Sequence, residues 1–448
     1  MKIGKQKAIL VIFLLFHLFL IIRLQFTAWP EMTLWPYLIT KGWLPYKDIA
    51  VVHTPLLFVD LTILYKLFGV GLWQLKIYTW LLILLTDVLI FYVAKEIWSK
   101  KIAICSMLLF IPLQLFYEGN GLWFDLALVP IALIIFYFVK KKEYLWAGVF
   151  WALAFLTKQT AFWFLLPVGL MFFPNEVFEK IKKFILGICI VFFPTLLIIW
   201  AIGILPDFIY WAFKFGIGTL PKASGQVNLP TIRQLATSLL PFSVFIFLPF
   251  VQKRKKDLIL VVWAICGFLG AFPRFELFHF QPALPFLAIG AGMVFVNIKK
   301  FKPVFNHLLL GYALLILVLV SRSFAREWGR GNRFFEPEVV NLASYVKENT
   351  EPNDKIYVLN AWDSIYAWSD TLPAVMPWIP HLPWYMELPG VQEDIVSGLD
   401  IVRPKLILQG EYSETGLGSY KPKLIDEFIK DNYEISDKIG GYLILRGK

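Results

Sequence analysis

Apolar runs of about the length of a membrane span recur along most of this chain. A helix needs roughly 20 apolar residues to cross a hydrocarbon core of about 30 Å, and we count runs of about 15–23 residues, several of them short. We place such runs near residues 8–27, 72–94, 102–117, 124–139, 144–157, 160–174, 184–204, 232–251, 257–272, 281–297 and 304–321. The sequence therefore predicts a mainly α fold with a polytopic membrane domain of about 11 spans, covering residues 1–321.

The composition and the position of the basic residues support a membrane protein. Hydrophobic residues make up 58% of the chain and charged residues only 17%, against roughly 25% charged in soluble domains. The net charge of +11 comes mostly from short clusters between the apolar runs, which argues against nucleic-acid binding. The clusters are Lys2/Lys5/Lys7, Lys95/Lys100/Lys101, Lys140/Lys141/Lys142, Lys180/Lys182/Lys183, Lys253/Arg254/Lys255/Lys256 and Lys299/Lys300/Lys302.

The same clusters predict the orientation of the chain in the cell membrane. When the runs are threaded in order, all six clusters fall on one side, which the positive-inside rule makes the cytoplasm. The N-terminus is then cytoplasmic, on a retained signal anchor, and residues beyond about 322 are extracytoplasmic. Residues 55–69 form one further apolar stretch, but counting it as a span would invert every later cluster. Because it contains Asp60 and Lys66, we interpret it as an amphipathic helix in the outer interface, within a first outer loop at 28–71.

Residues 322–448 differ in character and predict an extracytoplasmic α/β domain. They carry more charge and more turn residues, and no further span. Short apolar segments at Lys355–Asn360 and Lys405–Gln409 are typical of buried strands. A helix is expected over Pro422–Asn432, followed by a strand around Tyr442–Leu445.

Ionisable residues gather on the predicted outer side. Polar groups at membrane depth are costly, so a set on one face is a functional hypothesis. The set is Glu31, Lys47, Asp48, His53, Glu118, Asp125, Lys158, Arg274, Glu276 and His279, and Trp29, Trp35, Trp43, Trp123 and Trp211 accompany it. Carboxylates beside cations suit a hydroxyl to be deprotonated and a phosphate to be bound, and aromatic rings stack on sugars.

Each of these residues also has a purely structural interpretation. Tryptophans at span ends ordinarily form the interfacial belt, and Lys47 and Asp48 can simply be solvated. Glu118 and Asp125 flank a turn and can serve as helix N-terminal charges. Lys158 is harder to explain this way, because it lies at a tight re-entry between two apolar runs.

The order of these motifs resembles the GT-C glycosyltransferases, most of all the branch of the protein O-mannosyltransferases and the bacterial aminoarabinose transferases of lipid A. Four stretches carry the resemblance over roughly the first two-thirds of the chain. They are Trp29–Asp48 with His53-Thr54-Pro55, then Asp125, then Thr157-Lys158, and finally Arg274 through Pro285. The family commonly has Asp-Glu where this chain has Glu31-Met32, and often a Lys where it has Thr54.

The resemblance implies inverting transfer of a sugar from a polyprenyl-phosphate-linked donor to a glycan, lipid or protein acceptor on the outer face. It implies that Glu31 and Asp125 are catalytic, with a loop carboxylate as general base. Lys158, Arg274 and His279 would bind the donor phosphate, and Tyr46, Asp48, His53 and Glu118 would contact substrate. The departures at residues 31–32 and 54 leave open whether a divalent metal takes part.

Three other functions are weighed against this one. A polysaccharide polymerase or ligase shares the lipid-linked substrate, but the acidic first loop argues against it. A secondary transporter usually shows internal repeats and broken helices at the bilayer midplane, whereas here the polar residues lie at one edge. A non-catalytic receptor does not account for Lys158 and Arg274 at depth.

Overall fold

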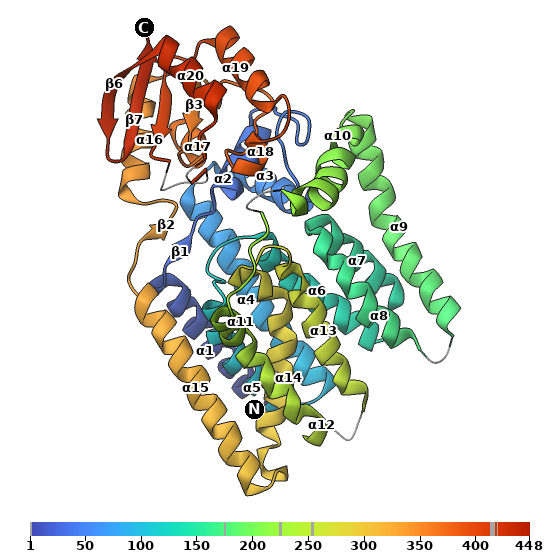
Figure 1. Cartoon of the computed structure of the whole chain (residues 1–448). Coiled ribbons are helices and arrows are strands. Elements are labelled where there is room, and N and C mark those ends of the chain that lie inside the picture. Colours follow the sequence, from blue (N-terminus) through green and yellow to red (C-terminus); the bar gives the residue numbers. More distant parts are fainter. Residues whose placement is uncertain (1, 174–175, 224–225, 252–254, 413–416, 419) are drawn as a thin grey trace.

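A computed structural model describes residues 2–173, 176–223, 226–251, 255–412, 417–418 and 420–448. It has a long helical part that holds the N-terminus and a part with a β-sheet that holds the C-terminus (Figure 1). Each predicted apolar run is helical over most of its length, although the first helix ends at Arg23 and residues 26–27, which were predicted to continue it, form a strand. The segments are α1 (Lys2–Arg23), α4 (Leu72–Ile97), α5 (Lys100–Phe116), α6 (Phe124–Lys140), α7 (Tyr144–Thr157), η1 (Gln159–Phe164) with α8 (Leu165–Phe172), α9 (Val177–Ala201), α11 (Ile232–Leu239) with η4 (Leu240–Phe247) and α12 (Leu248–Val251), η5 (Lys255–Leu258) with α13 (Ile259–Phe268) and η6 (Leu269–Ala271), η7 (Leu277–Ala283) with α14 (Leu284–Val296), and α15 (Pro303–Glu327).

Several of these helices can cross a membrane. Within the described residues, five helical segments are long and apolar enough, and three shorter apolar ones accompany them. The outer flanks of α9 and α15 expose large apolar side chains such as Phe193 (72% exposed) and Leu317 (60%). Such surfaces are stable in lipid rather than water. The chain is thus a multi-pass membrane protein, while the count of about 11 spans stays a prediction. Lys253 and Arg254 of the fifth basic cluster lie outside the described residues.

The first outer loop is largely helical. The predicted interface helix is present as α3 (Leu56–Phe68). Its buried side includes Leu57 and Leu61, and its other side exposes Val59, Ile63 and Leu67. The sequence analysis did not predict α2 (Pro30–Thr40), which is almost wholly buried. The segment contains two prolines and lacks an amphipathic period, so its sequence does not indicate a helix. Packing against α3 on one side and the C-terminal part on the other stabilises it.

The C-terminal part contains a five-stranded sheet in the order β4-β3-β5-β7-β6. The strands are β3 (Lys355–Leu359), β4 (Leu372–Pro373), β5 (Ile407–Gly410), β6 (Tyr433–Ile439) and β7 (Tyr442–Gly447). Strand β3 is parallel to β4 and β5, and β7 is antiparallel to β5 and β6. The helices are α16 (Pro337–Asn349), α17 (Ser364–Ser369), α18 (Pro383–Met386), α19 (Val391–Val402) and α20 (Lys423–Asn432).

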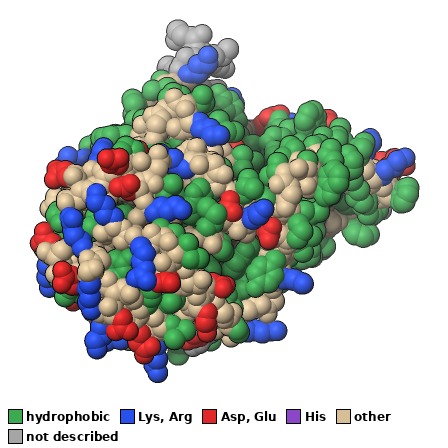
Figure 2. Space-filling view, turned by 90° about the horizontal axis from the view of Figure 1, so that it is seen from above, with side chains coloured by type: hydrophobic (Ala, Val, Ile, Leu, Met, Phe, Trp, Pro, Cys, Tyr) green, Lys and Arg blue, Asp and Glu red, His purple; other side chains and the backbone are tan. Residues whose placement is uncertain are grey.

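The expected strands at 355–360, 405–409 and 442–445 and the expected helix at 422–432 are all found. Strand β6 was not predicted: Asp437 interrupts the alternation of Tyr433, Ile435 and Ile439, and the side chains of residues 434–438 are all exposed. Helix α15 continues past residue 322 to Glu327. Viewed from the end that holds the sheet, Lys and Arg side chains mix with Asp and Glu, while hydrophobic side chains cover the lobe beside them (Figure 2). The domain boundary and the extracytoplasmic location stay predictions.

Several contacts join the parts. Helix α2 lies beside α17 (Figure 1), where the Tyr37 hydroxyl donates to the Thr371 carbonyl at 2.9 Å and Lys41 pairs with Asp370 at 2.7 Å. Strand β1 (Phe26–Thr27), which follows α1, pairs in parallel with β2 (Asn332–Arg333), which follows α15. The first outer loop is therefore held between the membrane helices and the C-terminal part.

Candidate active site

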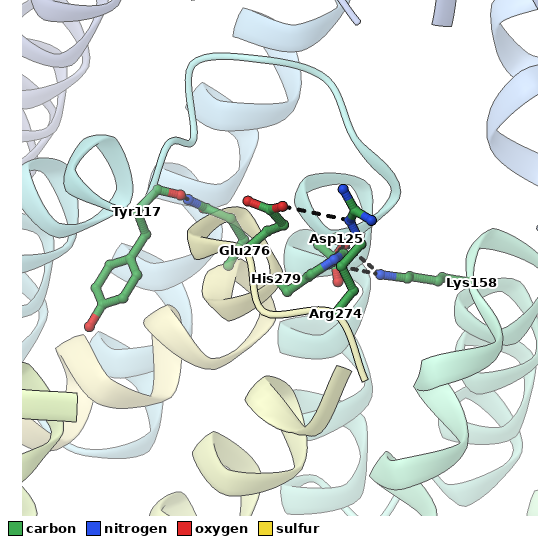
Figure 3. Close-up of polar contacts among 7 residues, drawn as sticks. Tyr117, Asp125, Lys158, Arg274, Glu276 and His279 are labelled. Carbon is green, nitrogen blue, oxygen red and sulfur yellow. Dashed lines mark hydrogen bonds and ion pairs between the residues drawn. The ribbon is translucent and has the colours of Figure 1, made fainter. Parts of the chain in front are cut away.

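Asp125, Lys158 and His279 come from three helix ends and point toward one another (Figure 3). Asp125 lies in the first turn of α6, Lys158 directly follows α7, and His279 lies in the short helix η7. The Lys158 Nζ is 2.6 Å from Asp125 Oδ2, and the His279 Nδ1 is 2.7 Å from the same oxygen. The Lys158 and His279 nitrogens are 3.2 Å apart. Residues from 33 to 154 positions apart thus form one polar cluster, which we call the Asp125 cluster (Asp125, Lys158, His279).

Local structure explains why these charges lie at these ends. A carboxylate is favourable at a helix N-terminus and an ammonium at a C-terminus, because each complements the helix dipole. Lys158 has extended dihedral angles (φ −154°, ψ 135°) and separates α7 from η1. This break by one residue is the tight re-entry that the sequence predicts, and it directs the lysine toward α6.

The Asp125 cluster is almost closed to solvent. The exposed fractions of Asp125, Lys158 and His279 are 1%, 5% and 9%. The Asp125 Oδ2 atom accepts hydrogen bonds from Lys158 Nζ and His279 Nδ1. The Oδ1 atom of Asp125 is buried and has no hydrogen-bond partner among the described residues. Buried charges are tolerated only when they are paired, so Asp125 holds the Lys158 ammonium group in place and also contacts the His279 ring.

Arg274 lies at the edge of the Asp125 cluster (Figure 3). Its Nε atom is 3.6 Å from Glu276 Oε1, and its guanidinium group lies 5.4 Å from the centre of the Trp384 ring. The loop that carries it is fixed by Asn228, whose backbone N–H donates to Pro273 O at 3.1 Å. Because its side chain is 39% exposed, Arg274 is more accessible to a ligand than Lys158.

His53 lies against the same site. Its ring centre is 4.1 Å from that of Phe124, which precedes Asp125, and 6.0 Å from that of Trp123. Burial, reinforced by the positive charge of Lys158, lowers the pKa of His53 to about 3. His53 is therefore neutral at physiological pH. The uncharged ring can make a polar contact with a ligand, but it cannot contribute a positive charge that binds a phosphate.

Glu31 lies in the first turn of α2. Its Oε2 atom is buried and has no hydrogen-bond partner in the part of the chain that the structure describes. Burial raises the pKa of this carboxyl group above its usual range. The adjacent Trp29 packs on Trp123 and Phe278 with ring centres 5.2 Å apart in each case. Since Phe278 precedes His279, a wall of aromatic rings (Trp29, Trp123, Phe278) links Glu31 to the Asp125 cluster.

The other predicted substrate residues lie in different surroundings. The Tyr46 hydroxyl donates to His53 O at 2.8 Å, and Asp48 Oδ2 accepts from Leu44 N at 2.8 Å. Both contacts stabilise the first outer loop, and the predicted substrate role of these two residues is untested. Glu118 lines a cavity of about 270 Å³ beside the ends of α1 and α15. Burial raises the pKa of Glu118, and the charge of Arg333 partly offsets this.

The C-terminal part contributes residues that the sequence analysis missed. Asp363, just before α17, has a buried Oδ1 without a partner among the described residues, and its pKa is raised well above the usual value by burial and by the Glu31 charge. Trp384 of α18 contacts Arg274. No sequence signal pointed to them, because they meet the first loop only through tertiary packing. Among the described residues there is no group of three or more His, Cys, Asp or Glu side chains that could hold a metal ion, and metal dependence stays untested.

Comparison with known proteins shows what this chain is similar to. Residues 52–200 match the family model described as dolichyl-phosphate-mannose-protein mannosyltransferase, and this range includes His53, Asp125 and Lys158. This part of the chain is thus similar to a family of glycosyltransferases, in agreement with the resemblance that the motif order predicts.

Two solved structures share the fold over nearly the whole chain. ArnT from Cupriavidus metallidurans, in a crystal structure with bound undecaprenyl phosphate, has 11% identity and a TM-score of 0.65, and the match covers 99% of this chain and 97% of ArnT. The archaeal oligosaccharyltransferase AglB from Archaeoglobus fulgidus, in complex with an inhibitory peptide and a dolichol-phosphate, has 12% identity and a TM-score of 0.53, with 100% and 75% covered. No curated protein matches this chain in sequence.

Proposed function

We propose that this glycosyltransferase transfers a sugar from a polyprenyl-phosphate-linked donor to an acceptor on the outer side of the membrane, with inversion at the anomeric carbon. The observation that carries the proposal is the Asp125 cluster, which places a fixed ammonium group at the end of the membrane helices. The lipids named for ArnT and AglB are both polyprenyl-type phosphates, and they support the donor class.

In this mechanism Lys158 and Arg274 face the donor phosphate. The bond between the anomeric carbon and the phosphate oxygen breaks, and the phosphate leaves with the electron pair. Cations stabilise the charge that develops on a leaving phosphate without protonating it. Asp125 positions Lys158 and His279, since its Oδ2 already accepts from both.

Glu31 is the proposed general base. It takes the proton from the acceptor hydroxyl while that oxygen bonds to the anomeric carbon from the opposite face. A carboxylate whose pKa is raised by burial is a stronger base than a solvated one. The unpartnered Oε2 leaves an acceptor site for that proton.

Replacement of Glu31 tests the proposal. Glu31→Gln keeps the shape but cannot take the proton, so turnover should fall by about 10²–10⁴-fold, the usual contribution of a general base. Binding of the lipid-linked donor should persist. The assay follows a radiolabelled polyprenyl-phosphate hexose into membrane extract, with the exposed Glu143→Gln as a charge-matched control. Turnover within about threefold of wild type in a folded sample would remove Glu31 from this role and leave Glu118 and Asp125 as candidates.

A further inference from the structure

The cavity that Glu118 lines is not used by the proposed chemistry. It has a volume of about 270 Å³, close to the lower size of ligand pockets, and lies between the ends of α1 and α15 and the loop that joins α5 to α6. Its lining includes two carboxylates and three guanidinium groups, from Glu118, Glu327, Arg326, Arg330 and Arg333. We call it the arginine cavity.

The arginine cavity has a fixed framework. The Asn120 amide donates to the carbonyls of Ile21, Leu24 and Gln25 at 2.9–3.1 Å, and its Oδ1 accepts from the Trp80 ring at 3.2 Å. The parallel pairing of Thr27 with Arg333 ties the end of α1 to the segment after α15. A pocket held in this way is formed before a ligand arrives, which lowers the entropic cost of binding.

Its charges are only partly paired. Arg326 pairs with Glu327 at 3.1 Å. Arg330 and Arg333 have no carboxylate within ion-pair distance among the described residues. The guanidinium group of Arg333 lies 4.8 Å from the Phe334 ring centre and 5.7 Å from that of Trp29. Two guanidinium groups without an ion-pair partner, close to two carboxylates, suit a phosphate with hydroxyl or amino groups beside it.

The position of the arginine cavity points to a lipid. Both helices that end there expose apolar side chains below it, with Phe16 and Phe19 on α1 and Leu314 and Val318 on α15. Such surfaces face the acyl chains of the bilayer. A headgroup at this level can therefore enter the arginine cavity while its chains remain in the membrane.

We propose that the arginine cavity binds the phosphate-bearing headgroup of an anionic lipid, and that this lipid is the acceptor of the sugar. The inference rests on the proposed function for the acceptor role. The Arg333 group contacts Trp29 on one side, and Trp29 packs on Phe278 beside His279. The aromatic wall thus has the arginine cavity on one side and the Asp125 cluster on the other, which keeps two phosphates apart and brings an acceptor hydroxyl near Glu31.

A binding experiment tests the site without turnover. The purified protein is offered phosphatidylglycerol or phosphatidylcholine in detergent, and the retained lipid is measured by native mass spectrometry. We expect retention of phosphatidylglycerol only, and about tenfold weaker retention in the double variant Arg330→Gln/Arg333→Gln, because two charge-assisted hydrogen bonds are lost. The control Arg233→Gln/Arg322→Gln removes the same charge from exposed positions outside the arginine cavity and should bind as wild type. Equal retention in all proteins, or displacement by inorganic phosphate as strong as by the lipid, overturns the lipid site.

A second measurement tests the acceptor role. Radiolabelled polyprenyl-phosphate hexose is incubated with the protein and a total lipid extract, and the products are separated by charge. We expect label in the acidic lipids, and a loss of it in the Arg330→Gln/Arg333→Gln variant while donor binding is unchanged. Label in neutral lipids or protein, or weaker donor binding in this variant, overturns the acceptor assignment. If wild type transfers no label at all, the proposed function fails, while the binding experiment still decides on the arginine cavity.

Discussion

The Lys158 ammonium group has two partners in an environment that excludes water, the Asp125 carboxylate and the His279 ring. Neither partner follows from the residues around Lys158 in the chain. A lysine that is 5% exposed persists only because the carboxylate offsets its desolvation. At the residue scale, the integrity of the site therefore depends on Asp125.

The Asp125→Asn substitution tests this dependence. It leaves the Lys158 charge buried beside a neutral amide, so the free energy of unfolding should fall by about 3–5 kcal/mol, as for other buried pairs that lose one partner. Thermal unfolding of the purified protein in detergent measures the loss. The exposed Asp400→Asn, which breaks the surface pair with Arg403, should change stability by about 0.5 kcal/mol or less.

A double substitution separates charge from packing. Asp125→Asn combined with Lys158→Met removes both charges and should recover part of the lost stability. If Asp125→Asn unfolds at the same temperature as Asp400→Asn, the buried ion pair does not stabilise the fold in the way described.

The position of Lys158 also depends on where α7 packs, because Lys158 directly follows this helix. Helices α7 and α9 approach closely through two glycines. A Cβ atom on Gly148 would lie 2.0 Å from Phe184 O, and one on Gly187 would lie 2.1 Å from Leu145 O. Small residues allow such approach in membrane proteins, where packing drives helix association.

Gly187→Ala should therefore push α9 away from α7. The added methyl meets backbone atoms that cannot rotate aside, so we expect a loss of about 1–3 kcal/mol, typical of overpacking. Turnover should also fall, since Lys158 terminates α7. The matched control is Gly169→Ala in α8, where an added Cβ meets nothing within 4 Å. Similar unfolding temperatures and turnover for the two variants would contradict this role of the α7–α9 contact.

The orientation of the whole molecule decides which side of the membrane the reaction occurs on. All six basic clusters predict the same side, and the positive-inside rule makes that side cytoplasmic. A reporter fused after Lys256 should be active only in the cytoplasm, and one fused after Lys448 only outside. A reporter after Lys256 that is active outside would invert the topology, and the site would then face a cytoplasmic donor.

The sequence by itself determined the membrane class, the helical segments and the order of the site motifs. These features are encoded locally, since the length and apolarity of a run decide whether it is a membrane helix, and Asp125 and Lys158 can be read from short motifs. The helix α3 and the strands β3, β5 and β7 were likewise predictable from local pattern.

Only the tertiary structure decided which of these residues meet. The Asp125 cluster joins three helix ends, and α2 is a helix because α3 and α17 cover it. The Glu31 charge raises the pKa of Asp363, which is more than 300 positions away, and the pairing of β1 with β2 holds the ends of α1 and α15 together at the arginine cavity. Contacts of this kind depend on how many elements pack at once, and no local stretch of sequence contains that information.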